Sequence, residues 1–360
     1  MTDPSPTNWQ KFLGNGKSQP LSIEAMPEAP GWRQFMKHSD FQEIAGEAQQ
    51  RWEQIQALSE NDLRGQERGV SFKIGEEYTD VLHAVNAALH LRRPLLVTGK
   101  PGSGKTSLAY AIAHELQLGV VLSWPVNARS TVTDALYRYD AVARLQDAQL
   151  QRERSMGDYF RLGPLGSAFL PWPLPRVLLV DEIDKCDINL PNDLLNLFEE
   201  GSYEIPELVR CKDEAEFQQV QVRTADADVS ASIQGGKVTC YQFPLVIMTS
   251  NGERDFPPAF LRRCLRLRMP DPSQNRTALT NIVESHLKRG LDEQRWSRLE
   301  AEAAKLVEAF MNRGASETAD VATDQLLNVV YLLTREVRPE TPAEREALEN
   351  LLLKGLSEEN

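Results

Sequence analysis

The chain has 360 residues, of which 41% are hydrophobic, so it is long enough for roughly two domains and can bury a full apolar core. Its 52 acidic and 40 basic residues give a formal net charge of −12. This charge repels polyphosphate and argues against nucleic acid as a partner, although a local basic patch would escape the average.

The composition also argues against membrane and metal-cluster proteins. The N-terminal segment has no basic stretch followed by an apolar one, and no later stretch approaches about 18 unbroken apolar residues. The cysteines show no CxxC spacing, which argues against zinc and a disulfide framework and is typical of a reducing compartment. They are Cys186, Cys211, Cys240 and Cys264. We therefore predict a cytoplasmic protein without membrane contact.

Residues 1–69 are predicted to form an N-terminal arm and one helix. Residues 1–35 are rich in proline and contain spaced aromatic residues, a composition that rarely folds alone and suggests an arm docked on a protein surface. Apolar residues then recur with a 3.6-residue period over 41–58, which predicts an amphipathic helix. The glycines of RGQERG, residues 64–69, indicate a linker.

Residues 70–272 alternate between strand and helix patterns, which predicts an α/β fold with a doubly wound parallel sheet. A helix is expected over 76–91. The expected strands are nearly continuous apolar runs, typical of strands buried on both faces; they cover 95–98, 120–123, 177–180 and 245–249. Two inserts interrupt this pattern, a helical and charged one near 128–160 and one near 203–242 that contains a strand pair, 203–205 and 238–243.

From residue 273 to residue 360 the periodic apolar faces are all helical. This segment is predicted to form a separate helical domain that ends in a C-terminal helix.

The glycine-rich turn GKPGSGKT, residues 99–106, lies between a predicted strand and a helical pattern. This spacing and context predict a P-loop, in which backbone N–H groups and the N-terminal end of the following helix face phosphate oxygens. Lys105 is predicted to contact the β- and γ-phosphates, and the Thr106 hydroxyl to bind Mg²⁺. The predicted nucleotide ligands are Gly99, Pro101, Gly102, Ser103, Gly104, Lys105, Thr106 and Ser107.

Two carboxylates follow the apolar strand in RVLLVDEIDK, residues 176–185. Asp181, at the carboxyl end of this strand, is expected to reach Mg²⁺ through water. Glu182 is then placed to orient and polarise a water for in-line attack on the γ-phosphate. Asp184 and Lys185 are expected at the surface or in an interface rather than in the chemistry.

A third motif, residues 246–272, contains a strand that ends at Asn251, then a loop, a short helix and the pair Arg262 and Arg263. The Asn251 strand is expected beside the Asp181 strand, so this amide is predicted to hold the attacking water or a γ-phosphate oxygen. The two arginines lie too far along the chain to serve their own P-loop easily. We predict that at least one projects into a neighbouring subunit's site, where it stabilises the charge that develops in phosphoryl transfer.

Together these motifs resemble those of the AAA+ ATPases over roughly residues 70–335. GKPGSGKT resembles the Walker A motif, LLVDEID the Walker B motif, MTSN sensor 1 and PPAFLRRC the arginine-finger helix. The helical C-terminal region resembles the family's lid. FRLGPLGSAF and NLFEEGSYEIPE resemble the MoxR group, in which Arg263 matches the finger best. APGWRQF and TDQLLNVVYLLT resemble its branch associated with von Willebrand factor A-domain proteins.

The resemblance implies an ATP- and Mg²⁺-dependent ATPase that forms a homo-hexameric ring and remodels a partner, such as a von Willebrand factor A-domain protein. It also implies that both inserts face a ring pore or a partner, and the alternative is that they are ordinary surface elaborations. One feature departs from the family: TADVATDQLL, where many lids carry a basic sensor 2 residue, contains no arginine.

Two other functions stay open on the sequence. MTSNGERD resembles a loop of GTP-using McrB-type restriction motors, although the acidic charge and the lack of an evident DNA-binding domain argue against this function. The other is a nucleotide-dependent scaffold with little hydrolysis. The missing sensor 2 base favours it, and the intact Asp181–Glu182 pair opposes it.

Overall fold

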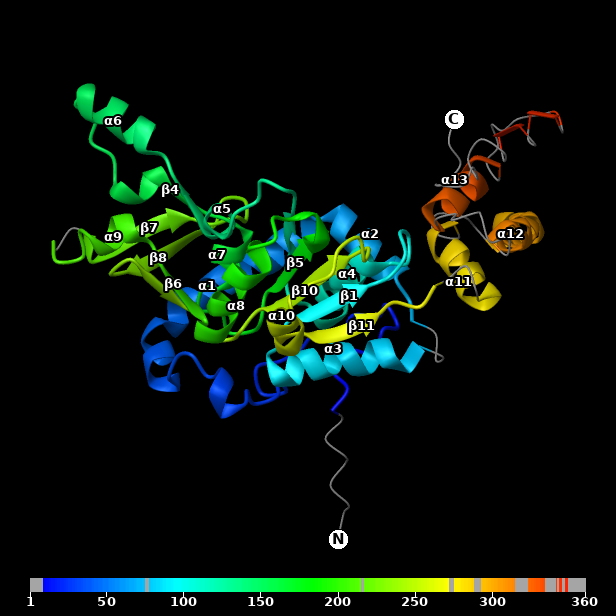
Figure 1. Cartoon of the computed structure of the whole chain (residues 1–360), viewed down its shortest axis with the longest axis horizontal. Coiled ribbons are helices and arrows are strands. Elements are labelled where there is room, and N and C mark those ends of the chain that lie inside the picture. The colour runs from blue at the N-terminus through cyan, green and yellow to red at the C-terminus, as the bar shows by residue number, and fades with distance from the viewer. Residues whose placement is uncertain are drawn as a thin grey trace, which may run out of the picture.

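The computed structural model describes residues 9–74, 78–214, 217–271, 275–287, 293–314 and 323–333, with residues 341, 343–344 and 347–348 beyond them (Figure 1). The described residues form an α/β core, a second sheet at one end of this core, and a group of helices at the other end. None of the described helices is both long and apolar enough to span a membrane.

The core is built on a parallel sheet of five strands in the order β11-β1-β10-β5-β2. These are β1 (Leu95–Thr98), β2 (Leu122–Pro125), β5 (Val177–Asp181), β10 (Leu245–Ser250) and β11 (Leu265–Arg268). The helices α3 (Thr79–Leu91), α4 (Lys105–Leu116), α7 (Pro164–Ala168) and α8 (Leu190–Glu200) belong to the same unit. The predicted parallel α/β fold is confirmed.

Two details of this sheet differ from the sequence prediction. The second strand begins at Leu122, two residues later than expected. The strand β11 was not expected, because its sequence LRLR is too short and too charged to resemble a buried strand. It lies at the edge of the sheet, where Arg266 and Arg268 are exposed while Leu267 is buried.

The predicted linker at 64–69 is wrong, because these residues lie within helix α2 (Leu63–Ser71), which follows α1 (His38–Asn61). The Asp62 side chain caps α2 by accepting a hydrogen bond from the Gly65 N–H at 3.0 Å. Gly69 does not break the helix but lets it approach α4. A Cβ at Gly69 would lie 2.8 Å from the Tyr110 carbonyl oxygen and 2.5 Å from the His114 Cβ. The glycine therefore serves close helix packing.

The two inserts combine into one second sheet of six strands, in the order β3-β4-β7-β8-β9-β6. The strands are β3 (Tyr137–Tyr139), β4 (Phe160–Leu162), β6 (Ser202–Glu204), β7 (Gln219–Arg223), β8 (Ser230–Gln234) and β9 (Lys237–Thr239). The predicted strand pair is confirmed as β6 and β9. The wholly helical prediction for 128–160 is wrong in part, since β3 and β4 lie there beside α5 (Val132–Leu136) and α6 (Ala141–Gln149).

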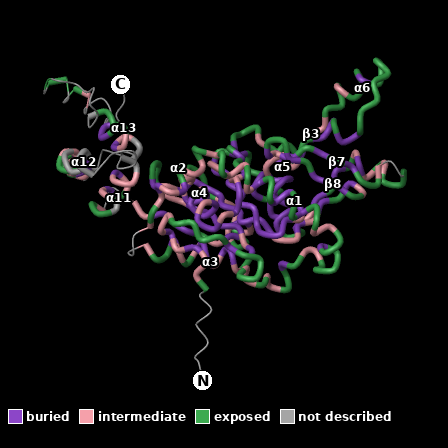
Figure 2. Tube along the Cα trace, turned by 180° about the vertical axis from the view of Figure 1, so that it is seen from behind, coloured by how far each residue is buried: buried purple, intermediate pink, exposed green. Residues whose placement is uncertain are grey.

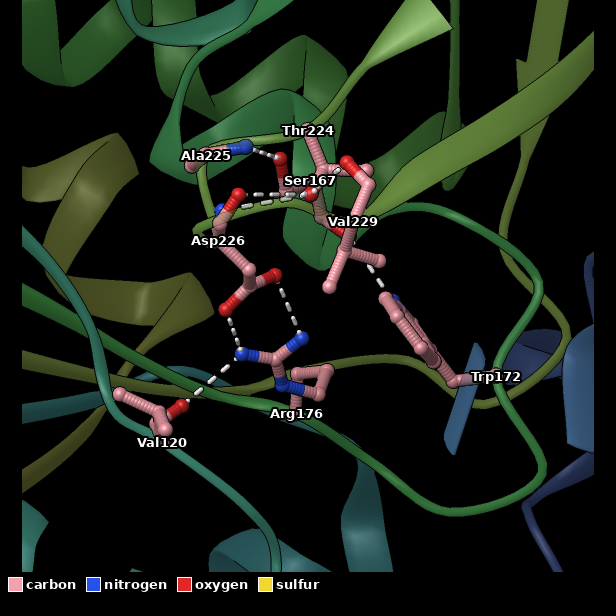
Figure 3. A network of polar contacts seen from close by, with 8 residues as sticks. All are labelled: Val120, Ser167, Trp172, Arg176, Thr224, Ala225, Asp226 and Val229. Atoms are coloured by element: carbon pink, nitrogen blue, oxygen red, sulfur yellow. Dashed lines mark hydrogen bonds and ion pairs between the residues drawn. The ribbon is translucent and has the colours of Figure 1, made fainter. Parts of the chain in front are cut away.

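A buried ion pair fastens this second sheet to the core (Figure 3). The Arg176 guanidinium, just before β5, donates to both carboxylate oxygens of Asp226 at 2.8 and 3.0 Å, and the two side chains are 0% and 2% exposed. Asp226 lies in the turn between β7 and β8. The same guanidinium donates to the Val120 carbonyl at 2.9 Å and lies 4.9 Å from the Trp172 ring. One side chain therefore joins the core to the insert.

The N-terminal arm docks on its own core. Phe12 is fully buried, and its backbone exchanges hydrogen bonds with the Asn86 side chain on α3 at 2.8 and 3.0 Å. The Glu115 carboxylate on α4 accepts from the backbone N–H groups of Leu13 at 2.5 Å and Asn15 at 3.1 Å. At the end of a short turn, η1 (Gly31–Arg33), the Arg33 side chain donates to the Phe198 carbonyl at 2.5 Å.

The described part of the C-terminal region is all helical, as predicted, and consists of α11 (Arg276–Leu287), α12 (Glu293–Gly314) and α13 (Thr323–Leu333). These helices bury a core of their own around Leu279, Val307, Phe310 and Val330. The predicted C-terminal helix lies mostly outside the described residues. Figure 2 shows the main core buried around α4 and α1, with α6 exposed at the far end of the second sheet.

The shorter elements are α9 (Pro206–Val209), α10 (Pro258–Arg263), η3 (Met156–Tyr159) and η4 (Ile183–Lys185).

Replacing Gly69 with alanine should lower the free energy of unfolding by about 1–3 kcal/mol, because the added methyl group forces α2 away from α4. Gly46 on α1 is the matched control, since a Cβ there meets no atom within 4 Å. Gly46→Ala should raise stability by about 0.5–1 kcal/mol. Denaturant titration measures both values, and equal effects of the two substitutions would contradict the packing of α2 on α4.

Asp226→Asn should lower the free energy of unfolding by about 3–5 kcal/mol, because it leaves the Arg176 charge buried without a counter-ion. The control is Asp228→Asn in the same turn, where the side chain is exposed and the φ of 56° is one that asparagine tolerates. Thermal and denaturant unfolding compare the two variants. A difference below about 0.5 kcal/mol would show that the pair does not hold the insert to the core.

Candidate functional site

A cavity of about 490 Å³ lies where the carboxyl ends of the core strands meet α2, the segment after it and the C-terminal helices. Its wall combines P-loop residues, the ends of β5 and β10, and residues from α11 and α13. The P-loop contributes Pro101, Gly102, Ser103, Gly104, Lys105, Thr106 and Ser107. Asp181, Glu182 and Asn251 also line this cavity, so the structure brings together almost all the predicted site residues.

The predicted P-loop turns between β1 and α4 on left-handed glycines. Gly102 and Gly104 have φ values of 73° and 84°, and α4 begins directly afterwards at Lys105. A Cβ at Gly104 would lie 2.8 Å from the Phe72 ring, so glycine is required there by both backbone conformation and space. Gly99 begins the turn and does not line the cavity. The turn directs the first N–H groups of α4 into the cavity, the arrangement that binds phosphate.

Lys105 folds back onto its own loop. Its Nζ donates to the carbonyl oxygens of Gly99 at 2.7 Å and Lys100 at 2.8 Å. Burial lowers the pKa of Lys105, while Asp184, Asp181 and Glu182 oppose this shift. The lysine is the buried cation of the site, and bound phosphate would take over from the neutral carbonyls as its partner.

Asp181 is held between two hydroxyl groups from neighbouring elements. Thr106 donates to its Oδ1 at 3.0 Å, and Thr249 on β10 donates to the same oxygen at 2.6 Å. A carboxylate and a hydroxyl are hard oxygen ligands that fit Mg²⁺, which completes its shell with waters and substrate phosphates. The described residues contain no cluster of three or more histidine, cysteine or acidic side chains able to hold a metal. The donor set therefore fits a Mg²⁺ ion that arrives with a phosphate.

Glu182 follows in a left-handed conformation with φ of 59°. Its backbone N–H donates to the Thr249 hydroxyl at 2.8 Å, which fixes the turn. Its carboxylate is 44% exposed and pairs with Lys185 Nζ at 2.8 Å, and this hydrogen bond raises the pKa of Lys185. The carboxylate thus borders the cavity while remaining accessible to water.

Asp184 is not the surface residue that the sequence suggested. It is buried, and its Oδ2 accepts hydrogen bonds from the Ser250 hydroxyl at 3.0 Å, the Asn251 N–H at 2.8 Å and the Glu253 N–H at 3.2 Å. The carboxylate thereby fixes the loop after β10 and presents Asn251 to the cavity. Sequence alone did not reveal this role, because the partners lie on a different strand.

Arg262 and Arg263 do not line this cavity. They are exposed at the end of α10, which lies beside α8 and apart from α11 and α13 (Figure 1). Arg263 Nε donates to Glu199 Oε1 at 3.1 Å, and the Arg93 guanidinium donates to the carbonyls of both arginines. The two arginines therefore do not contribute to the cavity of their own chain, and their predicted role in a neighbour stays a prediction.

Several wall residues escaped the sequence prediction. Phe72, Ile74 and Tyr78 come from the segment between α2 and α3, and Ile282 and Leu327 come from the C-terminal helices. These side chains give the cavity an apolar and aromatic end, suited to a nucleobase, at which Phe72 also lies against Gly104 of the P-loop. The sequence analysis did not identify these residues, because they belong to no recognisable motif. Asn281, Ile282 and Leu327 are the wall residues from the described C-terminal helices, and none is charged.

Comparison with known proteins shows what part of the chain resembles. Residues 94–264 match the family model of the AAA domain, dynein-related subfamily. No curated protein matches the chain in sequence. Just under half of the chain is therefore similar in sequence to an AAA domain.

Solved structures of similar fold are distant. NtrX from Brucella abortus in complex with ADP has 13% identity and a TM-score of 0.38, with 90% of this chain and 64% of that one covered. PCH-2 from C. elegans has 14% identity, a TM-score of 0.41 and coverage of 81% and 72%. The RuvB Holliday junction branch migration motor from Thermotoga maritima has 16% identity, a TM-score of 0.35 and coverage of 77% and 70%. The chain therefore spans somewhat less than two thirds of the NtrX structure.

Thr249→Val should impair hydrolysis more than nucleotide affinity, because it removes the bridge between Asp181 and the Glu182 backbone. We expect a loss of about 1–3 kcal/mol in stability from the unpaired groups. Thr98→Val on β1 is the control, since that hydroxyl donates only to the Leu267 carbonyl at 3.3 Å. Steady-state kinetics and denaturant titration compare the variants. Equal kcat values would show that Thr249 does not position the acidic pair.

Proposed function

We propose that this protein is an ATP-hydrolysing ring ATPase of the MoxR type that remodels or assembles a partner protein in the cytoplasm. The observation that carries the proposal is the convergence of Lys105, Thr106, Asp181, Glu182 and Asn251 on one cavity. The AAA domain match supports the ATPase core. The two MoxR-like motifs, before and after the Walker B motif, support the subgroup.

Each side chain of the site has a separate role in the proposed hydrolysis. Lys105 and the N–H groups of the P-loop hold the β- and γ-phosphates, while the apolar end of the cavity holds the base. Thr106 and Asp181 would hold Mg²⁺, which offsets phosphate charge when bound. Glu182 orients a water for in-line attack on the γ-phosphorus, and Asn251 holds the opposite side of that water or a γ-oxygen.

The arginine that completes the charge balance is proposed to come from the next subunit. Arg262 and Arg263 are exposed on α10 and outside their own cavity, as a residue that acts on a neighbour must be. Glu199 and Arg93 hold the end of α10 in place through side-chain hydrogen bonds. We propose a homo-hexamer in which each nucleotide lies at a seam between two subunits, with a von Willebrand factor A-domain protein as partner.

Two alternatives remain testable. A GTP-using motor of the McrB type would prefer GTP and respond to duplex DNA, so turnover of both nucleotides with and without DNA separates it from the proposal. A scaffold with little hydrolysis is favoured by the uncharged C-terminal wall of the cavity, because no described lid residue there offers a cation to the γ-phosphate. Turnover measured with and without partner decides between scaffold and motor.

Glu182→Gln should lower ATP turnover about 10²-fold or more while ATP still binds. The amide keeps the shape of the carboxylate but loses the basicity that activates water. Glu200→Gln, an exposed carboxylate at the end of α8, is the control and should keep parental turnover. Phosphate release and ATP binding are measured separately. If Glu182→Gln hydrolyses ATP at the parental rate, another group activates the water.

Arg262→Ala/Arg263→Ala chains should lower the ATPase activity of parental subunits when the two are mixed. Each site between two subunits needs an arginine from one chain and a cavity from the other. The double variant alone should be inactive but bind ATP. Activity is measured against the mixing ratio, with Lys105→Ala chains as the second component in a complementary series. Full activity of the double variant alone, with no decline at any mixing ratio, would rule out a shared site.

A further inference from the structure

The exposed face of the second sheet carries three arginines in register on adjacent strands. Arg138 on β3 pairs with Arg161 on β4, and Arg161 pairs with Arg223 on β7. Residues paired in this way project from the same face of a sheet. All three are exposed, whereas their strand neighbours Phe160 and Val222 are buried. We call this group the arginine row.

The arginine row does not stabilise the fold. Neighbouring strands lie about 4.8 Å apart, so the row spans about 10 Å, and like charges directly opposite one another repel. None of the three forms an ion pair within the described part of the chain. Arg223 Nη2 donates a hydrogen bond to the Asp158 carbonyl at 3.2 Å. The repulsion is thus left without a compensating carboxylate.

Protection of a sheet edge explains Arg138 but not the other two arginines. A charged side chain on an edge strand prevents pairing with other chains, and β3 is such an edge. The strands β4 and β7 lie inside the sheet, where Arg161 and Arg223 protect nothing. In a protein of net charge −12, three aligned cations on one face therefore indicate a surface for an acidic ligand.

We propose that the arginine row binds an extended acidic segment of a partner polypeptide. Guanidinium groups bind carboxylates through paired hydrogen bonds, and an extended segment presents alternate side chains on one face at about 7 Å intervals. Gln221 and Ser230 are exposed beside the row and offer neutral hydrogen-bonding groups to the same segment. The row thus recognises two or three carboxylates in sequence.

The surroundings favour a polypeptide over nucleic acid. Proteins that bind single strands stack bases on exposed aromatic rings. On the edge strand Arg138 is flanked by two tyrosines: Tyr137 is buried, and the ring of Tyr139 is already stacked on Phe160 at 4.6 Å and 16°. The net charge of −12 also repels a long polyphosphate more strongly than a short acidic segment.

This inference rests on the proposed function in one respect, since it assigns the chemistry of the partner that the ATPase remodels. It concerns equilibrium binding at a surface far from the cavity, so it is tested without hydrolysis. Loss of ATPase activity would leave the arginine row untouched, and loss of peptide binding would leave the ATPase site untouched.

The experiment uses fluorescence anisotropy with the full chain and a dye-labelled peptide of alternating glutamate and serine. The same peptide with glutamine in place of glutamate and a single-stranded oligonucleotide serve as comparison probes. The test variant is Arg138→Gln/Arg161→Gln/Arg223→Gln. The control variant is Lys17→Gln/Lys37→Gln/Arg64→Gln, which removes as many positive charges from exposed positions elsewhere.

We expect the glutamate peptide to bind the parent and the control, weakened by salt, and to bind the test variant about tenfold or more weakly. The melting temperature of the test variant should equal or exceed that of the parent, because the like-charge repulsion is gone. The proposal is overturned if the parent binds the glutamine peptide equally well, if both triple variants lose affinity alike, or if only the oligonucleotide depends on the row.

Discussion

The site depends on one carboxylate oxygen, Asp181 Oδ1, which accepts hydrogen bonds from Thr106 at 3.0 Å and Thr249 at 2.6 Å. These three residues come from α4, β5 and β10, and the parallel register of the strands brings them together. Because β5 and β10 are neighbours in the sheet and β10 also pairs with β1, the carboxyl ends of these strands lie together beside the P-loop. The same hydroxyl of Thr249 also accepts from the Glu182 N–H, so one threonine fixes both the Asp181 carboxylate and the Glu182 backbone.

Buried polar contacts, in addition to apolar packing, join the core to the second sheet and to the N-terminal arm. Arg176 and Asp226 join the second sheet to the start of β5, and Glu115 and Asn86 hold the N-terminal arm against α4 and α3. These contacts bring distant segments to elements that carry the nucleotide site.

Sequence reasoning predicted the elements whose chemistry is local. The P-loop and the Asp181–Glu182 pair follow from residue types at fixed spacing, and the buried strands follow from unbroken apolar runs. It failed where structure depends on distant partners. A linker is predicted at 64–69 because the packing of Gly69 on α4 is invisible in the sequence. A surface position is predicted for Asp184 because its partners lie at the end of β10 and in the loop that follows. The apolar wall of the cavity and the union of the two inserts in one sheet were missed for the same reason.

The central claim is that the turn before α4 holds the phosphates through Lys105. Equilibrium binding of ATP with Mg²⁺ to Lys105→Ala and to Lys100→Ala tests it most directly, because both variants remove one lysine from the same loop. Lys105 is buried in the cavity wall, whereas Lys100 points outward to Asp271 at 3.1 Å. The account predicts an affinity about 10- to 100-fold lower for Lys105→Ala and near the parental value for Lys100→Ala. Unchanged affinity in Lys105→Ala would contradict it.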